Sequence, residues 1–202
     1  MAPIIDMIKR AYRHYNKTMD IRKTLSRLII YFTLYSVFGW AYEVFLEVVV
    51  YRWGYSDRGV LFGPYCPVYG VGALLFIIIV YPMIKNRPYK ERLKYMPLVF
   101  LFSMLIATAL ELGTSYLLER IIGYWPWQTY ADYRFNFQAR IALSPSVRFG
   151  IGGVLFLYIL QPLFEKLTGA MSDRALRKTG LILFIIFAVD LAATLATRFL
   201  LK

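Results

Sequence analysis

Four acidic residues lie within long apolar stretches of the chain, where a charged group needs a specific reason. Glu43 and Glu47 are four residues apart and share one face of a helix, while Glu111 and Asp190 lie deep in two later stretches. A charged group at the centre of a bilayer costs about 2.5–3.5 kcal/mol on insertion scales, so such groups usually face the protein interior and have partners. The sequence therefore predicts buried carboxylates that bind a polar group or pair with bases.

Three arginines are candidate counterions for these acids. Arg58, Arg140 and Arg148 all lie on the side of the membrane where the helices of Glu43 and Glu111 emerge. For any single residue, a salt bridge between helices is a sufficient explanation. The convergence of several acids and arginines on one side favours a binding site, and this combination suits a zwitterionic or anionic solute, or a coupled proton.

Two segments between the apolar stretches resemble a pocket lining more than solvated loops. Residues 57–70 contain prolines, glycines and aromatic residues with few charges, and Tyr69 lies near the end of this segment. Residues 124–140 contain tryptophans, which we interpret as anchors at the membrane interface, and also Asn136 and Arg140, which can bind a polar or anionic group. Irregular backbone at membrane depth must be packed within protein, so we expect partly buried outer loops.

The composition restricts the class of protein. Of 202 residues, 59 % are hydrophobic, and they gather in blocks close to the roughly 20 residues that cross a bilayer. A soluble globular domain, a disordered chain and a disulfide scaffold do not fit this pattern. The single cysteine, Cys66, and the single histidine, His14, leave almost no material for disulfides, metal sites or histidine chemistry. The sequence predicts an all-α integral membrane protein.

About five transmembrane helices are expected, and the distribution of basic residues orients them. The helices are expected at about residues 28–50, 69–84, 96–118, 147–164 and 180–200, after a cytoplasmic amphipathic and basic segment at residues 1–27 and within a transmembrane domain at residues 28–202. Sixteen of the 24 lysines and arginines fall on the side of the N-terminus and eight on the other side. This bias predicts a multipass protein of the cell membrane with a cytoplasmic N-terminus.

An internal repeat is predicted from a match between two of these helices. Residues 69–76 (YGVGALLF) and residues 149–156 (FGIGGVLF) share a pattern of small and apolar residues at a spacing of 80 residues, and Pro82 and Pro162 follow at the same spacing. The chain therefore reads as two parallel-repeat helical hairpins plus a fifth helix. The expected parts are repeat 1 at about residues 28–84, repeat 2 at about residues 96–164 and the fifth helix at about residues 180–200.

The sequence lacks the common nucleotide-binding and hydrolytic motifs. It contains no G-x-x-x-x-G-K-[ST], no G-x-S-x-G and no H-E-x-x-H, so the chain is not itself expected to be an ATPase. No catalytic residue, metal site or cofactor is predicted. The net charge of +12 comes from segments that flank the apolar blocks, so we expect no nucleic acid partner.

Several short motifs follow one another in a characteristic order. They are Phe38-Gly39-Trp40 with Glu43, Arg58-Gly59 with Gly63-Pro64 and Pro67-Val68-Tyr69-Gly70, Glu111 with Thr114-Ser115, and Phe135-Asn136 with Arg140-Ile141 and Ser146. In this order, over about residues 31–156, the chain resembles the ABC-transporter type IV family, the CmpB-like permeases. It departs from the family at Gln128-Thr129 after Trp127, where relatives commonly have Asp-Tyr, and at Phe149, where relatives have Trp. The resemblance implies a multipass bacterial permease-like protein and names no substrate.

These observations favour a small membrane transport or ligand-binding protein, permease-like, over an enzyme. Its polar site is expected to face outward between the two hairpins. The residues expected to line the site are Glu43, Glu47, Arg58, Tyr69, Glu111, Asn136 and Arg140. The expected partners are the lipid bilayer, a polar or anionic small molecule, a separate ATPase subunit and a second copy of the chain.

Two alternatives remain open from the sequence. Buried acids beside arginines are also suited to a membrane-embedded enzyme that acts on a lipid or lipid-linked substrate. The small size and the basic cytoplasmic face also fit a structural subunit of a larger membrane complex. A neighbouring ATPase gene would favour the permease, and a lipid-biosynthesis cluster would favour the enzyme.

Overall fold

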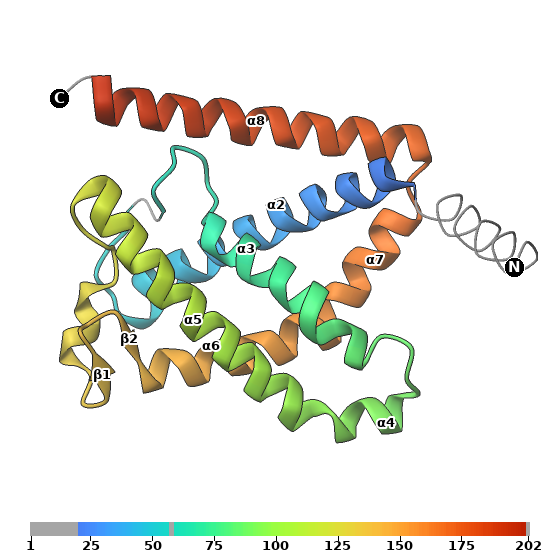
Figure 1. Cartoon of the computed structure of the whole chain (residues 1–202), viewed down its shortest axis with the longest axis horizontal. Coiled ribbons are helices and arrows are strands. Elements are labelled where there is room, and N and C mark those ends of the chain that lie inside the picture. The colour runs from blue at the N-terminus through green and yellow to red at the C-terminus, as the bar shows by residue number, and fades with distance from the viewer. Residues whose placement is uncertain (1–19, 57–58, 201–202) are drawn as a thin grey trace, which may run out of the picture. The chain divides into compact units, whose positions relative to one another are not determined.

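The computed structural model describes residues 20–56 and 59–200, with side chains up to residue 197, and is built almost entirely of helices (Figure 1). The helices are α2 (Ile21–Phe45), α3 (Pro67–Leu75), α4 (Tyr89–Lys94), α5 (Met96–Ile122), α6 (Leu143–Leu155), α7 (Gln161–Gly169) and α8 (Asp173–Leu200). The interfacial helix expected in the first 20 residues falls mainly outside the described residues, and Arg58 falls wholly outside them. The expected all-α membrane fold is confirmed.

The helices agree with the expected membrane spans. Within the described part of the chain, four helical runs are long and apolar enough to cross a membrane, and one apolar helix is shorter. The four runs are Ile21–Val50, Met96–Ile122, Leu143–Gly169 and Asp173–Thr197, and the shorter helix is Pro67–Met83. Hydropathy therefore located all five helices, although the first and the last begin seven residues earlier, at Ile21 and Asp173, than the expected residues 28 and 180.

The chain forms two compact units, and the candidate site residues belong to the larger one. Residues 31–166 make up this unit, while residues 20–30 and 167–200 make up the other. In the smaller unit, an ion pair of 2.5 Å joins Lys23 Nζ to Asp173 Oδ2 at the start of α8. This unit also contains Asp190, whose Oδ1 accepts a hydrogen bond of 3.2 Å from Thr194 Oγ1 within the same helix.

Local sequence signals explain where the helices of the larger unit begin and end. Pro67 occupies the first turn of α3 after the extended residue Cys66, a position where the missing N–H of proline costs nothing. Gly123 ends α5 in the left-handed conformation with a φ of +84°, and its N–H donates to the carbonyl of Glu119 at 2.9 Å. These residues set the start of one helix and the end of another on either side of the candidate site.

Glycines allow the helices of each hairpin to approach closely. A Cβ atom on Gly70 of α3 would collide with Ser36 and Phe32 of α2. In the second hairpin, a Cβ atom on Gly153 of α6 would collide with the side chain of Ser103 of α5. Because lipid offers no hydrophobic drive between helices, such backbone approach is a main source of their packing energy.

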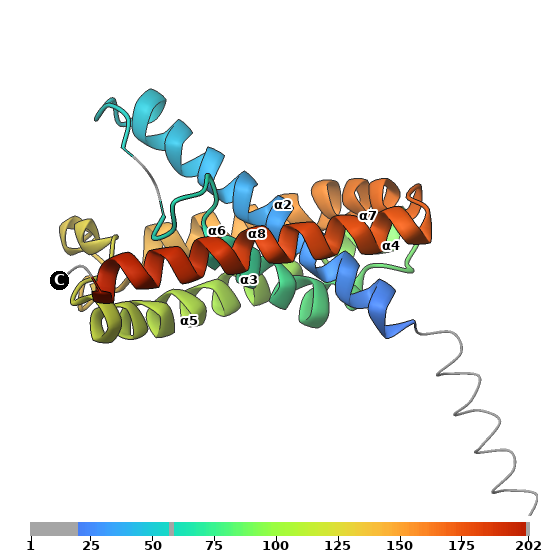
Figure 2. The same cartoon turned by 90° about the horizontal axis from the view of Figure 1, so that it is seen from above.

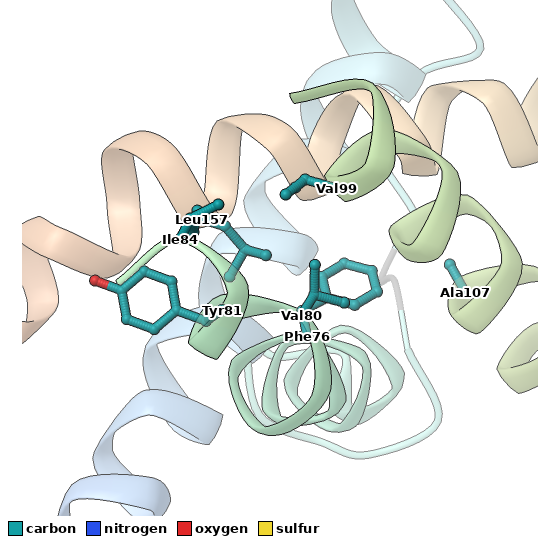
Figure 3. Close-up of a cluster of buried hydrophobic side chains, with 7 residues drawn as sticks. All are labelled: Phe76, Val80, Tyr81, Ile84, Val99, Ala107 and Leu157. Atoms are coloured by element: carbon teal, nitrogen blue, oxygen red, sulfur yellow. The ribbon is translucent and has the colours of Figure 1, made fainter. Parts of the chain in front are cut away.

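The apolar core of the larger unit joins the two hairpins (Figure 3). It gathers side chains from the end of the first hairpin, from α5 and from the segment that follows α6. Its buried members are Phe76, Val80, Tyr81, Ile84, Val99, Ala107 and Leu157. The two hairpins therefore pack against each other through this cluster.

The second helices of the two hairpins share a local irregularity. Each of α3 and α6 is followed directly by a five-residue π-helical segment, Phe76–Val80 in the first hairpin and Phe156–Leu160 in the second, so the segments are 80 residues apart. The Tyr35 hydroxyl lies 3.5 Å from the carbonyl oxygen of Phe156 and donates to Oε1 of the buried Gln161 at 3.2 Å. The shared spacing favours the expected duplication, which stays a prediction.

The two segments that connect spans near the candidate site are irregular and partly buried, as expected. Leu61, Tyr65 and Cys66 are buried, whereas Phe62 is exposed. The second segment lies at one end of α5, opposite the end that joins α4, and includes a two-stranded antiparallel hairpin of β1 (Asn136–Phe137) and β2 (Ile141–Ala142) (Figures 1 and 2). This small hairpin was not anticipated from the sequence.

Candidate functional site

Glu43 of α2 binds a tyrosine of the neighbouring helix. The ring of Tyr69 lies against Gly39, so a side chain at position 39 would collide with this ring. The hydroxyl of Tyr69 donates a hydrogen bond to Glu43 Oε1. Gly39 and Glu43 are one helical turn apart, so the missing side chain of the first lets the phenol reach the second. The sequence pattern Gly-x-x-x-Glu on α2 therefore positions an acid–tyrosine pair between α2 and α3.

Glu111 of α5 forms a second pair of the same kind. Its Oε1 accepts a hydrogen bond of 2.7 Å from the hydroxyl of Tyr130, which lies in the short 3-10 helix Gln128–Asp132 that follows α5. Only 6 % of the Glu111 side chain is exposed, and its other oxygen, Oε2, has no hydrogen-bond partner. A buried carboxylate oxygen without a partner is costly, so this atom marks a place where a further group can bind.

The two pairs share one electrostatic neighbourhood. Burial raises the pKa of the Tyr130 phenol above its usual range, the negative charges of Glu111 and Glu43 raise it further, and Arg148 opposes them. Tyr130 therefore stays a neutral hydrogen-bond donor, and its surroundings bring together charged groups from α2, α5 and α6. We call Glu43, Tyr69, Glu111, Tyr130 and Arg148 the acid–tyrosine cluster.

Arg148 of α6 connects this cluster to both hairpins. Its Nη1 donates to the hydroxyl of Tyr51 at 2.9 Å, and its Nη2 donates to the hydroxyl of Tyr133 at 2.7 Å. Its buried Nε has no partner. Arg148 thus binds phenols from the first hairpin and from the connection after α5, and keeps one N–H donor unused.

Glu47 is held by the segment that follows its own helix. Glu47 is 5 % exposed, and its carboxylate accepts two hydrogen bonds from Ser56, one of 2.7 Å from Oγ and one of 3.2 Å from the backbone N–H. Glu43 and Glu47 therefore have different hydrogen-bond partners, although they lie on one helix face. Arg58, which was expected near these acids, lies outside the described residues.

Arg140, a candidate counterion for the acids of these helices, pairs with Glu119 at the end of α5 and not with Glu43 or Glu111. Its Nη2 forms an ion pair of 2.5 Å with Glu119 Oε2, and its guanidinium lies between the rings of Tyr116 and Trp125, about 4 Å from each centroid. Nη1 also lies 3.4 Å from the hydroxyl oxygen of Ser115. Cation–π contact and a charge-assisted pair together hold the end of α5 against the connection.

Asn136 shapes a turn. Its Nδ2 donates to the carbonyl of Tyr133 at 2.7 Å, and its Oδ1 accepts from the N–H of Ala139 at 3.1 Å. Gln138 and Ala139 both have positive φ, +53° and +55°, in the turn that joins β1 to β2. The carbonyls of Ala139 and Arg140 accept hydrogen bonds from the indole N–H groups of Trp125 and Trp127. These hydrogen bonds stabilise the hairpin of β1 and β2. The expected role of the tryptophans as anchors at the membrane interface stays a prediction.

Comparison with known families supports the same class of protein. The family model described as "Putative ABC-transporter type IV" matches residues 30–195 of the chain. The chain belongs to this family. The resemblance noted in the sequence is confirmed, and it places the chain among ABC-transporter-type membrane proteins. No curated protein and no solved structure matches the chain.

The structure adds residues that sequence reasoning did not select. Tyr130, Tyr133 and Tyr51 donate or accept the hydrogen bonds that define the acid–tyrosine cluster. Tyrosines are so abundant in this chain, 17 of 202 residues, that none of the three stood out. The one available signal was position, because each lies in the segment that follows a helix carrying a buried acid.

Proposed function

We propose that the protein is a permease-like transport or ligand-binding protein of the cell membrane, with a polar solute site at the acid–tyrosine cluster. The observation that carries the proposal is the pair of carboxylates, half-buried Glu43 and buried Glu111, each bound to a tyrosine and each supplied by a different hairpin. A site shared by two bodies can change when they move relative to each other, as transport requires. Membership of an ABC-transporter-type family supports the same conclusion.

The proposed site is smaller than the one expected from the sequence. Glu43, Tyr69 and Glu111 belong to it, with Tyr130 and Arg148 added. Glu47, Asn136 and Arg140 have the hydrogen bonds described above and support the surroundings of the site. Because the chain has no ATP-binding motif, an ABC-type mechanism would require a separate ATPase subunit, and a second copy of the chain is part of this proposal.

Ligand-dependent thermal unfolding of the purified protein in detergent tests the proposed site. The probes are putrescine, glycine, acetate and inorganic phosphate, which represent cationic, zwitterionic and anionic solutes. We expect at least one class to raise the unfolding midpoint of the native protein, because a ligand that binds only the folded state stabilises it by mass action. The shift should be lost in Glu43→Gln.

Glu165→Gln is the matched control. This acid binds Lys85 and Tyr81 and lies outside the acid–tyrosine cluster, so the same chemical change there should leave the ligand-dependent shift intact. Equal shifts in the native protein and in Glu43→Gln for every probe would contradict the proposed site. An equal loss in Glu43→Gln and Glu165→Gln would also contradict it.

A further inference from the structure

Glu111 is the more deeply buried of the two acids in the acid–tyrosine cluster. It lies in the middle of α5, is 94 % buried, and has one oxygen bound to Tyr130 and one oxygen without a partner. An ionised carboxylate in this position would keep a full charge with half of its acceptor capacity unused. Buried carboxyl groups avoid this penalty by binding a proton.

The charges around Glu111 do not balance when it is ionised. Glu43 lies in its electrostatic neighbourhood on α2 and repels it, while Arg148 on α6 attracts it. Arg140 is paired with Glu119 and does not compensate. Among the described residues, the repulsion from Glu43 opposes the attraction of Arg148, so an ionised Glu111 has a charge that no ion pair balances.

The groups that act on Glu111 come from several elements. They are Glu43 from α2, Tyr130 from the connection and Arg148 from α6. Among them only Arg148 is a base, and its two terminal nitrogens already donate to Tyr51 and Tyr133. Within the described residues, no ion pair joins Glu111 or Glu43 to a base.

We propose that Glu111 is an exchangeable proton-binding site and that the proton is the coupling ion of the transport cycle. While Glu111 is buried as described above, its carboxyl group holds the proton and is neutral. When the hairpins move and water reaches the site, the O–H bond breaks, the proton passes to water and the carboxylate remains beside Arg148. The second half of this proposal rests on the proposed transport function, whereas the first half does not.

A proton suits this site better than a metal cation. Within the described residues, no group of three or more histidine, cysteine, aspartate or glutamate side chains could hold a metal ion. A proton needs only one carboxylate oxygen, which Oε2 of Glu111 supplies. Glu43 is the weaker candidate because it is only half-buried and has no orphaned buried oxygen.

Infrared spectroscopy of the purified protein in lipid nanodiscs tests the proton-binding site without any solute. A protonated carboxyl group absorbs in a region separate from carboxylates and amides, so its band can be followed as the pH is raised. We expect a band at neutral pH that disappears at higher pH. Glu111→Gln should remove this band, and Glu165→Gln should leave it unchanged.

A second variant keeps the result interpretable if Glu111→Gln folds poorly. Glu43→Gln removes the neighbouring negative charge, so Glu111 should lose its proton more easily and the band should disappear at a lower pH than in the native protein. A band that persists in folded Glu111→Gln, or the absence of any carboxyl band between acidic and neutral pH, would overturn the proposal. An unshifted transition in Glu43→Gln would also count against it.

Coupling to transport is tested separately in proteoliposomes that contain the pH indicator pyranine. A gradient of whichever of the four probe solutes binds should acidify or alkalinise the lumen in the native protein but not in Glu111→Gln. Solute binding without proton movement in the native protein would overturn the coupling and leave the proposed function standing. If no probe binds while the infrared band behaves as expected, the proposed function fails and the proton site stands.

Discussion

At the scale of single residues, the site depends on phenols more than on salt bridges. The buried acids suggested arginine partners, yet Glu43 and Glu111 bind tyrosines, and Arg148 also donates to tyrosines. A phenol satisfies a carboxylate without adding a second charge that must itself be desolvated.

The turn between β1 and β2 offers a residue-scale prediction about stability. Ala139 adopts a φ of +55°, which glycine adopts without the steric cost that a Cβ atom imposes. We expect Ala139→Gly to raise the free energy of unfolding in detergent by about 0.5–1 kcal/mol, since left-handed residues with a Cβ cost about 1–2 kcal/mol and glycine returns part of this in chain entropy.

The control for this prediction is Gly123→Ala at the end of α5. Gly123 also has a positive φ, +84°, and no atom lies near its missing side chain, so alanine there should lower stability through backbone strain alone. Chemical unfolding followed by tryptophan fluorescence measures both variants. A loss of stability in Ala139→Gly would mean that the turn is not strained in the way described.

At the scale of elements, close helix approach decides where the polar side chains lie. Because Gly39 leaves room for the ring of Tyr69, α3 can present a phenol to α2, and similar glycines bring α6 against α5. Hairpin packing and site geometry therefore depend on the same small residues. Two neighbouring glycines of α6, Gly152 and Gly153, allow the effect of helix packing on stability to be measured apart from the effect on the backbone.

Gly152 and Gly153 form a matched pair for testing this packing. A methyl group on Gly153 would collide with Ser103, whereas one on Gly152 would meet nothing. Alanine favours helix by about 1 kcal/mol over glycine, so we expect Gly152→Ala to be neutral or stabilising. Gly153→Ala should lower the free energy of unfolding by about 1–3 kcal/mol, as overpacking does. Equal effects in detergent unfolding would contradict the described α5–α6 contact.

The positions of the helices could be predicted from the sequence, whereas the hydrogen bonds between them could not. Apolar blocks of sufficient length predicted five helices, because burial in lipid is read directly from side-chain hydropathy. The partner of Glu111 could not be predicted, since Tyr130 reaches it only after the connection folds back over the end of α5. For the same reason the sequence did not show which acid Arg140 would bind: it was predicted beside Glu43 and Glu111, but it pairs with Glu119 on the last turn of α5.

At the scale of the whole molecule, the distribution of basic residues predicts the orientation in the membrane. We predict that the α4 segment faces the cytoplasm and that the connection between α5 and α6 faces outward. In a Cys66→Ser background, Tyr124→Cys should react with a membrane-impermeant maleimide in intact cells, while Lys90→Cys should react only after permeabilisation. Both positions are exposed, so labelling reports sidedness and not burial. The reverse pattern would contradict the predicted orientation.

The central claim is that Glu43 and Glu111, from different hairpins, belong to one site. A double-mutant cycle of unfolding free energies in detergent, with Glu43→Gln, Glu111→Gln and both together, measures this most directly. Because the carboxylates influence each other and share Tyr130 and Arg148 as neighbours, we predict a coupling energy of at least about 0.5 kcal/mol at a pH where both acids are ionised. Additive effects, within about 0.3 kcal/mol, would mean that the two acids act independently and would contradict the shared site.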